Sequence, residues 1–174
     1  MRQRSLVAIG TVALLAVLPL FAIRVPRPAP ELTFKLANGQ VMKLSRFKGK
    51  VVALEFLLTT CPHCKRTSGV LRDMYAEYGP KGFQVLGVAI NEGAEKLVEP
   101  FRAELNLDYP VGYVSRDAAV DFLEHPIMLT MWMPQLVFID RKGVIRAQYG
   151  GADEFFRNQE QNIRQMIEKL LAEK

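Results

Sequence analysis

Cysteine and histidine are scarce in this 174-residue sequence, which contains two of each. Two cysteines are too few for a scaffold held together by disulfides. Zinc usually takes four ligands, and only His63 and His125 could complete a set with Cys61 and Cys64. We therefore expect no metal or other cofactor, and the two cysteines must be explained as a pair.

The sequence also has only a modest excess of positive charge. The sequence has 23 Lys and Arg residues against 18 Asp and Glu, a net charge of +5 that is spread along the chain. A nucleic-acid-binding face would need clustered Lys and Arg, so no nucleic acid partner is expected. Apolar residues make up 49% of the chain, and this length suits one domain with its own packed core.

Charged residues are absent from Ser5 to Ile23, and two arginines precede this run. A basic start followed by a long apolar run indicates a membrane anchor or a signal peptide. No small-x-small cleavage site precedes Arg24. We therefore predict that residues 1–23 form a signal-anchor helix in the inner membrane, with a cleaved signal peptide as the alternative. The rest of the chain would then lie on the periplasmic side.

Prolines alternate in residues 24–30, which favours an extended polyproline conformation and predicts a stiff linker before a globular domain over residues 31–174. Asn38-Gly39 lies between two short apolar runs and predicts a hairpin. Asp117 and Asp153 are expected to cap helices. The predicted strands cover residues 32–36, 41–44, 51–58, 83–90, 109–114, 135–140 and 144–149, and the predicted helices cover 62–78, 95–104, 117–123 and 153–171. This order predicts an α/β domain with a mixed central sheet, helices on both faces and an N-terminal β-hairpin.

Cys61 falls at the junction of the predicted strand 51–58 and the predicted helix 62–78. Unpaired N–H groups and the helix dipole stabilise a thiolate at such a position, so Cys61 is predicted to be the nucleophile. Cys64, one turn into the helix, is predicted to be buried and to act as the resolving thiol of a Cys61–Cys64 redox disulfide. Pro62 presets φ for the first helical turn. The alternative is an inert pair of core cysteines.

A strand that ends in C-x-x-C at a helix start, followed by a βα unit and a proline that opens a ββα tail, resembles the thioredoxin fold. The resemblance covers the chain from about Pro30 to the C-terminus and implies a thioredoxin-like three-layer fold. Lys50-Val51-Val52, Phe83–Val88 and Pro134–Gly143 resemble the TlpA/ResA redoxin branch, whose members are typically membrane-anchored thiol–disulfide oxidoreductases. Leu54-Glu55-Phe56 and Cys61-Pro62-His63-Cys64 instead resemble the strongly oxidising DsbA type.

His63 lies between the two cysteines. The resemblance implies that it stabilises the Cys61 thiolate, as a cation or a hydrogen-bond donor, and so makes the disulfide more oxidising. The alternative is an exposed spacer residue.

Glu55 lies six residues before Cys61, in a strand that is otherwise apolar. The resemblance places it beneath the dithiol, where related proteins carry a buried acid. Desolvation should raise its pKa, and it could then carry a proton to or from Cys64. The alternatives are a carboxylate on a less buried face, or one paired with a lysine such as Lys81 or Lys142.

Pro134 falls where the thioredoxin fold places a cis-proline opposite the cysteines. The backbone of Met133 would then be free to pair with an extended substrate segment, and Trp132 and Met131 would form an apolar surface beside it. Simple core filling is the alternative for Trp132 and Met131.

We therefore predict an exported, membrane-tethered thiol–disulfide oxidoreductase. Its substrates would be cysteine-containing exported proteins, and a membrane redox partner would recycle the dithiol. The C-P-H-C sequence favours the oxidising end of the range. The alternatives are a copper-binding assembly factor of thioredoxin fold, in which His125 would be a ligand, and a peroxiredoxin-like peroxidase.

Overall fold

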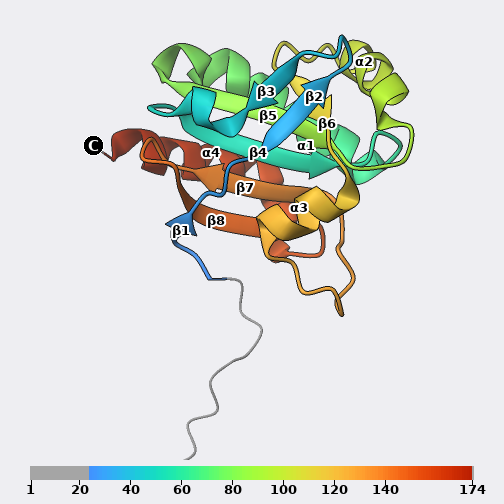
Figure 1. The fold of residues 1–174 in the computed structure, drawn as a ribbon. Helices are drawn as coiled ribbons and strands as arrows, with labels where there is room; N and C mark the ends of the chain where they lie inside the picture. Colours follow the sequence, from blue (N-terminus) through green and yellow to red (C-terminus); the bar gives the residue numbers. More distant parts are fainter. Residues whose placement is uncertain (1–23, 174) are drawn as a thin grey trace, which may run out of the picture.

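The computed structural model describes residues 24–173 (Figure 1). The predicted signal-anchor over residues 1–23 lies outside this range. Within residues 24–173, no helix combines the length and the hydrophobicity needed to cross a membrane.

One mixed sheet forms the centre of the domain, with the strand order β1-β8-β7-β4-β5-β6-β2-β3. Strands β4, β5 and β6 run parallel, whereas β7 is antiparallel to β4 and the hairpin β2–β3 joins the sheet through an antiparallel pairing of β2 with β6. The strands are β1 (Arg27–Pro28), β2 (Thr33–Leu36), β3 (Val41–Lys43), β4 (Val51–Leu57), β5 (Phe83–Ala89), β6 (Val111–Tyr113), β7 (Gln135–Ile139) and β8 (Val144–Gly150).

Strands β4 and β5 are central because their sequences are apolar on both faces. Every residue of either strand is buried, and the two pair in register from Val51 opposite Phe83 to Leu57 opposite Ala89. Such doubly buried strands are typical of a sheet that is covered on both sides. Glu55 is the one charged residue in these two strands.

Helices cover both faces of this sheet, as predicted (Figure 1). The first face packs against the buried stripes of three helices, and the second packs against a fourth helix and the β2–β3 hairpin. The prediction of a three-layer α/β fold with an N-terminal hairpin is therefore confirmed. The helices of the first face are α1 (Pro62–Tyr78), α2 (Ala94–Glu104) and α4 (Gln159–Ala172), and the helix of the second face is α3 (Arg116–Leu123).

The segment predicted as a stiff linker, residues 24–30, is partly joined to the domain instead. Arg27–Pro28 forms the edge strand β1, which pairs with Val144 and Ile145 of β8, and the N–H of Ala29 donates to the carbonyl of Gly143 at 2.9 Å. The Arg27 side chain is buried. The folded domain thus begins several residues before residue 31. Pro28 can belong to this strand because an edge strand has positions where no N–H is needed for the sheet hydrogen bonds.

Two of the predicted helix starts are also wrong. Ser115, rather than Asp117, caps α3, because its side chain accepts a hydrogen bond from the N–H of Ala118 at 3.2 Å. After Asp153 the chain first makes a 3-10 turn over Glu154–Asn158, and α4 follows it. Neither difference moves the residues of the candidate site.

Candidate active site

Cys61 lies where β4 leads into α1, at the N-cap position of that helix. Its N–H donates to the carbonyl of Leu58 at 3.0 Å, and its carbonyl accepts the N–H of Lys65 at 3.0 Å. Pro62 occupies the first turn of the helix, where a missing N–H costs nothing. The Cys61 side chain is half-buried, so its sulfur can be reached from solvent at the end of the helix dipole.

Cys64 is fully buried, one turn further along α1. Its Sγ accepts a hydrogen bond from the N–H of Leu58 at 3.5 Å. Burial raises the pKa of the Cys64 thiol well above its usual range, and the nearby charge of Glu55 raises it further. The two thiols therefore differ in the way that disulfide exchange requires, with one accessible and one protonated and protected.

Glu55 lies in the middle of β4 and has no exposed surface. Its Oε2 accepts a hydrogen bond from the hydroxyl of Ser68 at 2.7 Å, whereas its buried Oε1 has no hydrogen-bond partner among the described residues. Desolvation raises the pKa of Glu55 to about 8, against the smaller opposing effect of the Ser68 hydrogen bond. The alternatives of an exposed carboxylate or a lysine-paired one are wrong, because Glu55 is buried and its partner is Ser68.

Ser68 and Tyr109 complete the surroundings of Glu55, and neither is predicted from the sequence. Ser68 is buried on α1, one helical turn after Cys64, so the same face of the helix presents both to β4. The Tyr109 hydroxyl donates to the Ser68 carbonyl at 3.2 Å. The only sequence signal for Ser68 is its position four residues after Cys64, and this spacing alone does not single out one residue of a helix.

His63 is exposed on the first turn of α1. Its Nδ1 lies 2.9 Å from Nη2 of Arg66. Since a guanidinium can only donate, Nδ1 is the acceptor in this contact. Arg66, which the C-P-H-C motif does not predict, therefore places a permanent positive charge next to His63.

Pro134 is buried at the start of β7, and the Met133–Pro134 peptide bond is cis. The antiparallel register pairs Gln135 with Phe56, so Pro134 lies beside the end of β4, from which the chain continues to Cys61. Residues far apart in the sequence thus meet at one end of the central strands.

The segment before Pro134 is held firmly. The Trp132 carbonyl accepts hydrogen bonds from the Gly151 N–H at 2.9 Å and from Nε2 of Gln135 at 2.6 Å. Gly151 approaches Met133 so closely that a Cβ added there would lie 2.3 Å from the Met133 carbonyl oxygen. The structure separates the two predicted apolar residues, since Met131 is buried in the second core whereas Trp132 is 62% exposed.

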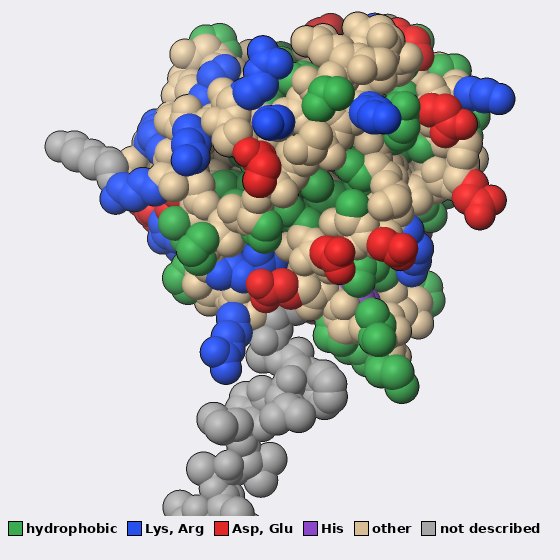
Figure 2. All heavy atoms as spheres, in the orientation of Figure 1, with side chains coloured by type: hydrophobic (Ala, Val, Ile, Leu, Met, Phe, Trp, Pro, Cys, Tyr) green, Lys and Arg blue, Asp and Glu red, His purple; other side chains and the backbone are tan. Residues whose placement is uncertain are grey.

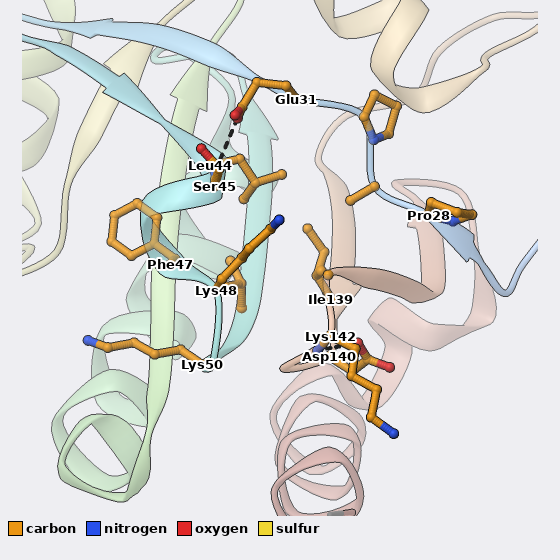
Figure 3. Close-up of a pocket in the computed structure, with 14 residues that line it drawn as sticks. Pro28, Glu31, Leu44, Ser45, Phe47, Lys48, Lys50, Ile139, Asp140 and Lys142 are labelled. Carbon is orange, nitrogen blue, oxygen red and sulfur yellow. Dashed lines mark hydrogen bonds between the residues drawn. The ribbon is translucent and has the colours of Figure 1, made fainter.

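Two cavities lie at opposite ends of the sheet, and one of them is beside the Trp132–Pro134 segment. One of about 300 Å³ is lined by Trp132, Gln135, His125 and Asp153, beside the Trp132–Pro134 segment. Another of about 290 Å³ lies at the opposite end of the sheet, between Phe47 and Lys48 on one wall and Ile139 on the other (Figure 3). Because Val52 and Ile139 lie at the ends of β4 and β7 remote from Cys61, this second cavity is separate from the dithiol. No group of three or more metal-ligating side chains occurs within residues 24–173.

Comparisons with known proteins agree with this geometry. The Redoxin family matches residues 24–167. The thiol-disulfide oxidoreductase ResA of Oceanobacillus iheyensis is 32% identical over 133 residues, which cover 74% of this chain and 66% of that protein. ResA of Geobacillus kaustophilus is 28% identical over 127 residues, covering 72% of this chain and 68% of that protein. The chain thus matches about two thirds of the length of these relatives.

Solved structures show the same fold. A Chlorobium tepidum structure named as a thiol:disulfide interchange protein DsbE superposes with a TM-score of 0.74 at 24% identity, covering 87% of this chain and all (100%) of that chain. A Neisseria meningitidis structure named as a thioredoxin gives a TM-score of 0.64 at 26% identity, covering 83% and 93% of the two chains. With the dithiol at the start of α1 and the Redoxin match over most of the chain, the protein belongs to the Redoxin family as a thioredoxin-like protein of the TlpA/ResA type.

Proposed function

We propose that this protein is an exported, membrane-tethered thiol–disulfide oxidoreductase that exchanges disulfides with cysteine-containing proteins through Cys61 and Cys64. One observation carries the proposal: Cys61 is accessible at the N-terminus of α1, while Cys64 is buried beside the buried acid Glu55. The similarity to proteins named thiol-disulfide oxidoreductase supports the same activity.

The exchange step follows from this asymmetry. In the oxidising direction, a substrate thiolate attacks Cys61, a bond forms between the two sulfurs, and the Cys61–Cys64 bond breaks. The electron pair leaves with Cys64, which would be an unfavourable buried thiolate. Glu55 is largely protonated at neutral pH because its pKa is raised to about 8, so it can give its proton to Cys64. In the reducing direction the carboxylate takes the same proton back.

The substrate would bind along the Met133–Pro134 segment. The fixed backbone there can pair with an extended chain, and the exposed Trp132 ring offers an apolar contact beside it. The substrates we propose are exported proteins with cysteine pairs, such as secreted chains or apocytochromes, and an oxidising role is favoured by the C-P-H-C sequence.

Location and partners rest on the sequence. The uncharged run from Ser5 to Ile23 would anchor the chain in the inner membrane, with the domain on the periplasmic side, where disulfides persist. A membrane redox protein would then restore the oxidation state of the dithiol after each turnover.

A trapping experiment tests the proposal. In a Cys64→Ser variant the resolving thiol is gone, so Cys61 should retain exported proteins as mixed disulfides that mass spectrometry can identify. The Cys61→Ser variant is the matched control and should retain none. If Cys64→Ser protein isolated from the cell envelope carries no mixed disulfide, or carries as many as Cys61→Ser, the proposal fails.

A further inference from the structure

The loop between α3 and β7 presents apolar side chains directly to solvent. Ile127 and Met128 are each 87% exposed and Leu129 is 57% exposed. The Leu129 N–H donates to the Pro126 carbonyl at 2.9 Å, which closes a turn with Ile127 and Met128 at its corner. We call Ile127, Met128 and Leu129 the apolar tip. Hydrophobic side chains protrude at the lower right of Figure 2, where Figure 1 places this loop.

The loop that carries the apolar tip is itself uncharged. From His125 to Ile139 the sequence contains no Lys, Arg, Asp or Glu. Exposed Trp132 follows the tip by three residues, so four large apolar side chains of one loop face water. Contiguous apolar patches are uncommon on soluble surfaces and usually mark an interaction site.

One hydrogen bond and one ion pair connect the base of this loop to the strand through which the chain enters the domain. Nη2 of Arg27, on β1, donates to the Phe122 carbonyl at 3.1 Å, and its Nε lies 3.5 Å from Oε2 of Glu124. Phe122 is near the end of α3, and Glu124 is the first residue after this helix. Residues 24–26, which lead into β1, and the loop also project on the same lower side of the domain in Figure 1. The apolar tip therefore lies on the same side of the domain as the start of the described chain.

In the sequence, the described chain directly follows the uncharged run that ends at Ile23. Four residue steps separate Ile23 from Arg27, and an extended chain of that length reaches at most about 14 Å. If the run lies in the membrane, Arg27 and the loop base bonded to it are held within about that distance of the bilayer surface.

We propose that the apolar tip inserts into the lipid bilayer next to the N-terminal anchor. This rests on the membrane tether of the proposed function. Two attachments, one through the anchor and one through the tip, fix how the domain sits on the membrane. Because the tip and the Trp132–Pro134 segment belong to one loop, the substrate-binding side of the dithiol is then turned toward the membrane surface. That orientation suits substrates or redox partners that are themselves membrane-bound.

The single tryptophan of the chain reports on this contact. The full-length protein is reconstituted in phosphatidylcholine–phosphatidylglycerol vesicles with brominated acyl chains, which quench tryptophan that touches the acyl region. We expect quenching of Trp132 in the wild type. Moving one large apolar side chain from water into the acyl region raises the equilibrium constant for insertion by about tenfold or more. Replacing all three tip residues with serine should therefore lower the inserted fraction at least about tenfold and abolish the quenching.

Val41→Ser is the matched control, because Val41 is an exposed apolar residue on the distant strand β3. It should leave the quenching unchanged, and all variants should still float with the vesicles. Unquenched wild-type protein that floats, or quenching that survives the triple serine substitution, would overturn the inference while leaving the tether intact. Wild-type protein that does not float with the vesicles would overturn both the inference and the proposed membrane tether. A triple variant that is slow in disulfide exchange without vesicles would show that the tip binds protein substrate, which also overturns the inference.

Discussion

The buried acid makes the stability of this domain depend on pH in an unusual direction. In the unfolded chain Glu55 loses its proton near its ordinary pKa of 4.5, whereas in the folded protein it holds that proton up to about pH 8. The folded state therefore binds more protons between these values, so its stability falls as pH rises from about 4.5 to 8. A Glu55→Gln substitution removes this titration and keeps an oxygen for the Ser68 hydroxyl.

The size of the effect follows from the same shift. Each tenfold difference in acidity between the folded and unfolded states is worth about 1.4 kcal/mol, so the penalty reaches about 5 kcal/mol above pH 8. Relative to wild type, Glu55→Gln should gain about 1.4 kcal/mol in free energy of unfolding for each pH unit across this window. The glutamine adds a buried N–H₂ group, and any cost of that group is the same at every pH.

Denaturant unfolding of both proteins between pH 4 and about pH 9 measures this difference. Using the oxidised, Cys61–Cys64-bonded form of each removes cysteine titration, so that Glu55 alone distinguishes them. A stability difference that is constant across the range would refute the reasoning, because it would mean that Glu55 ionises equally in both states.

Two further predictions concern the neighbours of the site. Ser68→Ala removes the one hydrogen bond that lowers the pKa of Glu55, so the carboxyl titration followed by NMR should move to higher pH, and an unmoved titration would contradict the assigned contact. Gly151→Ala forces a Cβ against the Met133 carbonyl and should cost about 1–3 kcal/mol and slow disulfide exchange. Gly69→Ala is the control, because Gly69 lies in helix α1 with open space around it, and this substitution should raise the free energy of unfolding by up to about 1 kcal/mol. Equal losses of stability in both variants would count against the close approach at Gly151.

The parts of the fold that sequence predicted well are those encoded locally. The α1 boundaries, Pro62 to Tyr78, were predicted as the structure has them, because a proline marks the start of the helix and Gly79-Pro80 its end. The central strands were recognisable because continuous apolar runs of that length leave few alternatives.

The misses depend on contacts between distant segments. Strand β1 is only two residues long and exists because Arg27 and Pro28 meet β8, more than a hundred residues later. Nothing in an alternating-proline sequence signals that pairing. Ser68 became a partner of Glu55 only once α1 was packed on β4, and serine on a helix usually faces solvent.

For the candidate site, motif spacing identified Cys61 and Cys64, and the resemblance drew attention to Glu55 and Pro134. The resemblance could not show that Arg66 contacts His63, because that contact depends on a side-chain rotamer that the sequence does not determine.

The most direct test of the account is the redox equilibrium of the Cys61–Cys64 pair. The protein is equilibrated with glutathione buffers of graded potential, and the oxidised fraction is measured by mass after thiol alkylation. We predict one reversible two-electron transition that is lost in Cys61→Ser and in Cys64→Ser, with a midpoint well above the value of about −270 mV for thioredoxin. A midpoint at or below that value would contradict the oxidising role, and the lack of any reversible transition would contradict the assignment of the dithiol as the active site.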